Sequence, residues 1–250
     1  MITGASAGIG EACAWDFAEE GCRLVLVARR LEKLNQMKAA LEAKFPGIRV
    51  HLVQLSVTDL DAIKQLPNAL PNDFKDVSIL VNNAGLAIGT PSVFENDAVD
   101  IKTVMDTNVT GTIAFCTAFL PGMKARGEGH VVNMGSIAGH KTYINASVYI
   151  ASKHAIYGFC EAARHDLCDT PIKVTHIVPG LVGNTEFSNV RLKDETKVAA
   201  TYKDIMHLRP EDCSDNVIYA VRLRIRLRLR LRPTRRVCLC LCYAYMRMRI

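Results

Sequence analysis

The chain has 250 residues, of which 49% are hydrophobic, and its formal net charge is +6. This length fits one α/β domain with a substantial core, and because no run of eighteen or more residues is apolar, we expect no membrane span. Ten arginines and no Lys, Asp or Glu fall within residues 217–250, so residues 1–216 carry 21 basic and 25 acidic side chains. Their net charge of −4 argues against a nucleic-acid partner bound by bulk charge.

The nine cysteines are scattered along the chain, and none belongs to a CxxC pair. Zinc sites and disulfide frameworks depend on such close spacing. We therefore expect no structural metal, reduced thiols and a cytoplasmic protein. A secretory signal is not expected either, since the chain begins directly with a glycine-rich turn.

Three glycines, Gly4, Gly8 and Gly10, separate a short apolar start from a helical pattern over residues 11–20. Glycine permits a tight turn and lets backbone N–H groups approach a phosphate at a helix N-terminus. The G-x-x-x-G-x-G spacing differs from the G-x-G-x-x-G dinucleotide fingerprint, so a strand–turn–helix joint without a ligand is the alternative. Because only three residues precede the turn, we expect a clipped first strand.

The second predicted strand, residues 23–28, is apolar almost throughout, which is typical of a strand buried on both faces. Arg29 and Arg30 follow it directly. In a doubly wound sheet this position binds the ribose of a dinucleotide, through an acidic residue where the ribose carries a 2′-hydroxyl. Two arginines suit a 2′-phosphate instead and favour NADP over NAD. The alternative is the solvated start of the next helix.

Helical and strand-like segments alternate along the rest of the chain. The helical segments are 31–45, 97–126 (interrupted near Asn108) and 147–168, and the strands are 50–55, 77–81, 130–135 and 172–178. Such alternation predicts the α/β class, with a Rossmann-type doubly wound parallel sheet and helices on both faces. The polar stretch 183–201, which follows Pro179-Gly180, is interpreted as a lid over the substrate.

Tyr149 and Lys153 lie four residues apart in the last of these helices, so both side chains leave the same helix face. Free tyrosine has a pKa of about 10, and a nearby ammonium favours the phenolate, which makes the phenol a usable acid or base. Ser136 follows a strand, and its hydroxyl would hold a substrate oxygen beside the tyrosine. Alone, the pair is a weak signal, because Tyr and Lys share helix faces in many proteins.

The chain changes character after residue 216. Arginine alternates with Leu, Val or Ile over residues 221–231, and Cys-Leu-Cys-Leu-Cys and Met-Arg-Met-Arg follow. Strict alternation is typical of a strand, but adjacent arginines on one face would repel one another. We interpret 217–250 as a low-complexity tail, the translation of a repeated or frame-shifted run, beside a single catalytic domain over 1–216. The alternative is a basic arm for a membrane or RNA.

Taken together, these motifs resemble the short-chain dehydrogenase/reductase family over roughly residues 1–215. The residues that carry the resemblance are Thr3-Gly4-x-x-x-Gly8-Ile9-Gly10, Asn82-Asn83-Ala84-Gly85, Asn108, Ser136, Tyr149-x-x-x-Lys153 and Pro179-Gly180. More narrowly, Asn-Asn-Ala-Gly-Leu-Ala, Gly-Ser-Ile-Ala-Gly and the run 179–191 resemble the NADP-dependent 3-hydroxy acid dehydrogenases. That resemblance implies a homotetrameric oxidoreductase that transfers hydride between NADP and a small 3-hydroxy acid such as serine, allo-threonine or 3-hydroxypropionate, without a nucleic-acid or membrane partner.

The resemblance also implies residue roles. Tyr149 would be the catalytic acid/base, Lys153 would lower its pKa and hold the nicotinamide ribose, Ser136 would orient the substrate oxygen, and Asn108 would anchor a proton-relay water. NADP would also contact Gly4, Ser6, Gly8, Ile9 and Gly10 through its pyrophosphate, Arg29 and Arg30 through its 2′-phosphate, Ser56 and Val57 through adenine, Asn83, Ala84 and Gly85 through ribose, and Pro179, Gly180, Val182 and Thr185 through nicotinamide. Arg191 is assigned to the substrate carboxylate from its charge alone.

Three features depart from the family pattern: the clipped first strand, Ser56 where an aspartate usually binds the adenine amine, and the tail. In the family, the last strand completes the sheet edge and part of the tetramer interface, and residues 217–250 do not resemble it. Two alternative functions therefore stay open. One is reduction of another carbonyl, such as a 3-ketoacyl thioester or a steroid, and the other is cofactor binding without turnover.

Overall fold

The computed structural model describes residues 1–183, 185–203 and 205–223. Six parallel strands form one sheet in the order β3-β2-β1-β4-β5-β6. They are β1 (Ile2–Thr3), β2 (Leu24–Ala28), β3 (Val50–Gln54), β4 (Ile79–Asn82), β5 (His130–Met134) and β6 (Lys173–Ile177). The strand order reverses between β1 and β4, which is the position at which doubly wound sheets bind their ligands. The predicted Rossmann-type parallel sheet is confirmed.

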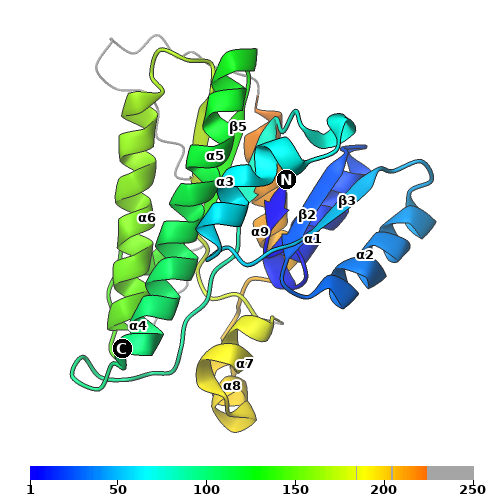
Figure 1. Cartoon of the computed structure of the whole chain (residues 1–250). Helices are drawn as coiled ribbons and strands as arrows, with labels where there is room; N and C mark the ends of the chain where they lie inside the picture. The colour runs from blue at the N-terminus through cyan, green and yellow to red at the C-terminus, as the bar shows by residue number, and fades with distance from the viewer. Residues whose placement is uncertain (184, 204, 224–250) are drawn as a thin grey trace.

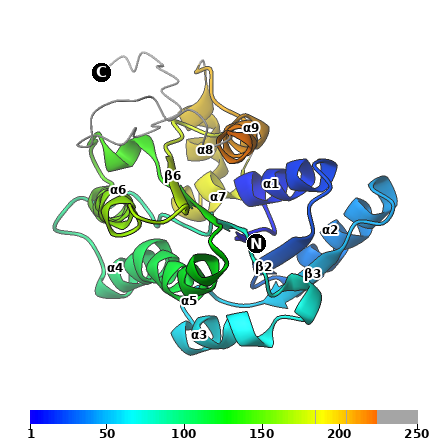
Figure 2. The ribbon, with the colours of Figure 1, turned by 90° about the horizontal axis from the view of Figure 1, so that it is seen from above.

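Helices cover both faces of the sheet (Figure 2). One face carries α1 (Gly8–Glu19), α2 (Leu31–Lys44) and α9 (Pro210–Arg222), and the other carries α3 (Leu60–Ala69), α4 (Ala98–Met105), α5 (Gly111–Arg126) and α6 (Ser147–Asp166). No helix in the described part of the chain combines the length and apolarity that a membrane crossing needs.

Strand β2 illustrates why the central strands are apolar without interruption. Leu24, Leu26 and Ala28 pack into the core formed with α1, α2 and α9, whereas Val25 and Val27 pack into the core formed with α3 and α5. Successive strand residues point to opposite faces, so a strand that is covered on both sides needs an apolar residue at every position.

The side chain of Asp59 caps helix α3. Asp59 accepts a hydrogen bond from the Ala62 N–H at 3.0 Å and so satisfies a free donor of the first turn. The helical pattern over 97–126 is divided into α4 and α5 by a five-residue π-helical turn, η2 (Asp106–Thr110). This turn contains Asn108, where the sequence placed an interruption.

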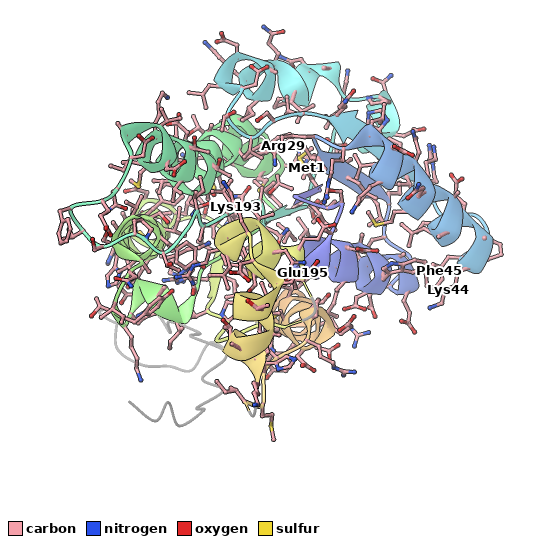
Figure 3. All side chains as sticks on the ribbon, turned by 90° about the horizontal axis from the view of Figure 1, so that it is seen from below. Met1, Arg29, Lys44, Phe45, Lys193 and Glu195 are labelled. Atoms are coloured by element: carbon pink, nitrogen blue, oxygen red, sulfur yellow. The ribbon has the colours of Figure 1, made fainter. Side chains whose placement is uncertain are left out.

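The polar stretch after β6 contains two short helices, α7 (Glu186–Leu192) and α8 (Glu195–Tyr202). They lie below the carboxyl edge of the sheet (Figure 1). In Figure 3, which views the molecule from that side, both helices lie in front of the sheet edge, with Lys193 and Glu195 at the turn between them. We call residues 183–203 the lid segment.

Helix α9 runs through residue 216, where the sequence analysis placed a boundary, and ends at Arg222. Val217, Ile218 and Ala220 are buried, and Val217 and Ile218 belong to the core with α1. Residues 217–222 are therefore part of the domain, because an apolar helix face continues across the compositional change. The predictions of a low-complexity tail and of an aberrant last strand fall on 224–250, outside the described residues.

Candidate active site

A cavity of about 1190 Å³ lies at the carboxyl edge of the sheet, between the glycine turn and the lid segment. It exceeds the usual range for single small-molecule pockets and has room for a dinucleotide and a small substrate. Most of the residues singled out in the sequence line it: Gly4, Ser6, Gly8, Ile9, Arg29, Arg30, Ser56, Val57, Asn83, Ala84, Gly85, Ser136, Tyr149, Lys153, Pro179, Gly180, Val182, Thr185 and Arg191. Gly10 and Asn108 lie behind its wall.

The glycine turn owes its shape to close backbone contacts. Gly4 and Gly8 have φ angles of +64° and +58°, which residues other than glycine rarely adopt. A Cβ on Gly10 would lie 2.5 Å from the Gly4 carbonyl oxygen and 2.5 Å from Asn83 Nδ2. Gly10 is therefore required for packing beneath the turn rather than for contact with a ligand.

Asn83 and Thr3 join the ends of β1 and β4. The Thr3 hydroxyl accepts hydrogen bonds from the Asn83 and Ala84 N–H groups at 3.0 and 3.1 Å, and Asn83 Nδ2 donates to the Thr3 carbonyl at 3.0 Å. These bonds hold the Asn-Asn-Ala-Gly segment flat against the sheet edge. Because Ala84 and Gly85 are small, a flat ring of a ligand can lie close to the backbone of this segment.

Tyr149 and Ser136 face each other across the cavity. The Ser136 side chain is close enough to lower the pKa of the Tyr149 phenol, and Ser136 accepts the Ala138 N–H at 3.1 Å, which fixes its rotamer. On its other side, the Tyr149 ring packs against Phe187 of the lid segment, with 5.7 Å between ring centroids. A substrate oxygen bound between the two hydroxyls would be held by both.

Lys153 is buried at the base of the site. Its Nζ donates to the Met134 carbonyl at 2.9 Å, and burial lowers its pKa to about 8. A Cβ on Gly85 would lie 3.6 Å from this Nζ and 3.3 Å from Asn108 Oδ1. Gly85, Asn108 and Lys153 therefore lie close together.

The side chain of Asn108 is fully engaged by the protein. Its Nδ2 donates to the Leu86 carbonyl at 2.8 Å and to Ser152 Oγ at 3.0 Å, while its Oδ1 accepts the Leu86 N–H at 2.8 Å. These bonds clamp the π-helical turn η2 to the loop after β4. The side chain is thus structural, and the Asn108 carbonyl accepts a hydrogen bond from the Thr112 hydroxyl at 3.0 Å.

The expected effect of Lys153 on Tyr149 is not found in this structure. Burial raises the pKa of the Tyr149 phenol to about 12, against the lowering influence of the Ser136 hydroxyl and of the Arg191 charge. The Lys153 Nζ lies 5.8 Å from the centre of the tyrosine ring and is directed to the Met134 carbonyl. The four-residue spacing brings the two groups to one site, but desolvation has the larger effect on the phenol.

Arg30 is fixed at the rim of the cavity by two neighbours. Its Nη2 donates to Ser6 Oγ at 3.0 Å, and its Nη1 forms an ion pair with Glu186 of the lid segment at 2.7 Å. Arg29 is exposed beside it, and its label in Figure 3 lies at the sheet edge. Ser56 bonds its neighbour Thr58 at 2.8 Å and so stabilises its own turn.

Thr185 and Arg191 of the lid segment, and Val182 just before it, line the cavity. Val182 pairs with Leu208 in an isolated bridge, which anchors the start of the segment. Thr185 lies against Gly8, and its Oγ1 is buried without a hydrogen-bond partner among the described residues. Arg191 lies over the Tyr143 ring at 5.9 Å, and its charge acts on Tyr149.

Tyr143, Glu186 and Lys33 were not assigned roles from the sequence. Tyr143 stands six residues before Tyr149, a separation without helical periodicity, and it reaches the site because the loop before α6 folds back. Glu186 and Lys33 meet only because the lid segment crosses to α2. A contact of this kind leaves no regular residue spacing in the sequence from which it could be predicted.

The chain is similar to known proteins over most of its length. The family model for short chain dehydrogenase matches residues 1–196. The NADP-dependent 3-hydroxy acid dehydrogenase of Escherichia coli strain K12 is 40% identical over 218 residues, which cover 87% of this chain and 86% of that protein. The sulfoacetaldehyde reductase of Chromohalobacter salexigens is 40% identical over 225 residues, covering 89% and 87%.

Among solved structures, the closed form of serine dehydrogenase complexed with NADP+ has a TM-score of 0.85 and 40% sequence identity, covering 89% of this chain and 88% of that chain. The chain therefore belongs to the short chain dehydrogenase family. The resemblance inferred from its motifs is confirmed, and the protein is an oxidoreductase.

Proposed function

We propose that this protein transfers hydride between NADP and the 3-hydroxyl carbon of a small 3-hydroxy acid. The observation that carries the proposal is the convergence of three side chains at one end of the cavity: Tyr149, the Ser136 hydroxyl that acts on its phenol, and the Arg191 cation whose charge reaches Tyr149. Two hydroxyls suit an alcohol or carbonyl oxygen, and the guanidinium suits a carboxylate next to it.

The residues present fit NADP at the other end. The left-handed glycines leave room for a pyrophosphate against backbone N–H groups, and Arg30 offers its guanidinium beside Ser6 to a 2′-phosphate. The buried, unpaired Thr185 Oγ1 suits a carboxamide. When bound, the nicotinamide supplies the hydride chemistry, and the protein supplies position and electrostatics.

In the oxidative direction, Tyr149 acts as the phenolate: its own proton leaves to solvent, it then takes the proton of the substrate hydroxyl, and Ser136 holds the same oxygen in place. Lys153 completes the floor of the site, and its pKa of about 8 allows it to exchange a proton near neutral pH. Asn108 holds η2 and the loop at Leu86 in register behind it. In the reductive direction the same groups act in reverse.

Arg191 is proposed to bind the substrate carboxylate. Its Nε donates to the Gly89 carbonyl at 3.4 Å, and Tyr143 supports the guanidinium from one face. This arrangement argues against a steroid, which carries no charge to match. The Arg191 cation matches the negative charge of a 3-hydroxy acid carboxylate, and it matches the negative charge of the sulfoacetaldehyde sulfonate equally well.

A kinetic screen tests the proposal. L-Serine, L-allo-threonine and 3-hydroxypropionate are assayed with NADP and with NAD, and sulfoacetaldehyde, a 3-ketoacyl thioester and a steroid ketone with NADPH, by absorbance of the reduced nicotinamide. We expect the highest kcat/KM with a 3-hydroxy acid and NADP. A higher value for sulfoacetaldehyde or for an uncharged carbonyl would replace the substrate class, and tight NADPH binding without turnover on any substrate would favour a binding protein.

A further inference from the structure

The guanidinium of Arg30 lies between a hydroxyl and a carboxylate that come from different parts of the chain. Its Nε and Nη2 donate to Ser6 Oγ at 3.3 and 3.0 Å, and its Nη1 donates to Glu186 Oε2 at 2.7 Å. The other oxygen of Glu186, Oε1, accepts from Lys33 Nζ at 2.5 Å. Glu186 therefore bridges two cations, one from the end of β2 and one from the first turn of α2.

The carboxylate of Glu186 occupies an unusual place. In a doubly wound sheet, an acidic residue at the end of β2 binds the ribose 2′-hydroxyl of NAD. Here that end carries Arg29 and Arg30, and the acid arrives from the lid segment instead. Arg30, Ser6 and Glu186 all line the same cavity.

A 2′-phosphate and Glu186 would compete for the same guanidinium. Bidentate recognition of a phosphate uses two parallel N–H groups of one guanidinium, and Nη1 of Arg30 is already bonded to Glu186. The hydrogen bonds from Lys33 and Arg30 hold the pKa of Glu186 below its ordinary value, so the carboxylate is charged at neutral pH and repels a phosphate. A 2′-hydroxyl is neutral and donates a hydrogen bond to such a carboxylate.

We propose that Glu186 is a cofactor-discriminating residue, which competes with the 2′-phosphate for Arg30 and tolerates a 2′-hydroxyl. Glu186 thereby limits the preference of the site for NADP over NAD. This inference rests on the proposed function in one respect, that the cavity takes a nicotinamide dinucleotide. The competing interpretation is an exposed ion pair that only fastens the lid segment. In that case, removing the Glu186 charge would change the affinity for ligands with and without a 2′-phosphate by the same factor.

Calorimetric binding of two fragments tests the inference without turnover. Adenosine 2′,5′-bisphosphate carries the 2′-phosphate and 5′-AMP does not, so the ratio of their dissociation constants reports on that phosphate alone. Exposed ion pairs have modest energies, so we expect Glu186→Gln to increase the preference for the bisphosphate by about threefold to fivefold. An unchanged ratio would overturn the inference.

Two further variants separate competition at Arg30 from net charge. The pKa of Glu11 responds to the charges of Lys33, Glu186 and Arg30, but among the described residues Glu11 forms no ion pair with them. Glu11→Gln is therefore the matched control and should change the ratio less than twofold. In an Arg30→Met background, Glu186→Gln should lose its effect, and an effect of equal size there would also overturn the inference.

The wild-type protein gives an independent readout. If it binds the bisphosphate no more tightly than 5′-AMP, the NADP assignment under the proposed function fails. The effect of Glu186→Gln on the ratio is measured separately. The inference fails if the wild type prefers the bisphosphate and Glu186→Gln shows the same preference.

Discussion

At the scale of single residues, the chemistry depends on how burial and charge act on the Tyr149 phenol. Burial alone favours the neutral phenol, and the Ser136 hydroxyl and the Arg191 charge favour the phenolate. Burial has the larger effect, and the pKa is raised to about 12. Because Arg191 lies on the lid segment, the segment supplies part of the electrostatic environment of the phenol and, under the proposed function, the contact to the substrate carboxylate.

Arg191→Met is expected to raise KM for L-serine about tenfold to a hundredfold, because a hydrogen bond to a charged group contributes about 1.5–3 kcal/mol. Turnover of L-serine methyl ester, which lacks the carboxylate, should change little. Steady-state kinetics with both substrates gives the comparison. Lys193→Met removes a cation from the same segment without touching the cavity and is the control. Equal losses with both substrates would contradict a carboxylate-binding role.

Some candidate site residues could be predicted from the sequence pattern because they stand at strand ends, and most of the others were assigned only through the resemblance to the family. Arg29, Arg30 and Ser136 follow strands, and the carboxyl ends of parallel strands meet at one edge. Contacts made by the lid segment could not be predicted, because the approach of Glu186 to Lys33 depends on tertiary packing. The raised pKa of Tyr149 depends on burial, which a spacing of four residues does not report.

At the scale of elements, the glycine turn and the helix after it form one packed unit. The turn is held from above by the Asn83 amide, which donates to the Thr3 and Gly4 carbonyls at 3.0 and 3.3 Å. Helix α1 starts at Gly8, so its first turn faces the cavity with free N–H groups. Any side chain inserted at Gly10 would push the turn away from β4.

Gly10→Ala is expected to lower the free energy of unfolding by about 1–3 kcal/mol, as overpacking does in a dense interior. The new Cβ would lie 2.5 Å from the Gly4 carbonyl oxygen. Gly158→Ala is the matched control, because a Cβ there meets nothing within 4 Å and alanine is the better helix former. Urea unfolding measures both. A Gly10→Ala protein as stable as the wild type would refute the packing argument.

At the scale of the whole molecule, the sequence predicted the doubly wound sheet because each central strand has to be apolar on both faces. It placed the end of the domain incorrectly within α9, since composition changes at residue 216 while the buried face of the helix continues to Ala220. The homotetramer that the resemblance implies stays a prediction, which light scattering would measure.

Two buried histidines make the fold sensitive to acid. Burial lowers the pKa of His130 and of His176 to about 3, whereas an unfolded histidine titrates near 6.5. Between these values the unfolded chain binds more protons, so stability is complete above pH 6.5 and is lost as the pH falls toward 3. The loss is about 2 kcal/mol for each histidine at pH 5.

Urea unfolding at pH 7.5 and at pH 5 measures this loss. His176→Gln should reduce the difference in unfolding free energy between the two pH values, because a glutamine does not titrate. His165→Gln, at an exposed position, should leave the difference unchanged. If wild type and His176→Gln lose the same stability, the neutral state of His176 in the fold is not the cause.

The central claim is that the Tyr149 phenol exchanges a proton with the substrate oxygen while hydride moves to or from the cofactor. Single-turnover hydride transfer by Tyr149→Phe, measured beside NADPH binding by fluorescence titration, tests this most directly. We predict that transfer falls by at least about a hundredfold, the typical contribution of a general acid or base, while NADPH affinity changes by only a few-fold. Transfer at the wild-type rate would contradict the account.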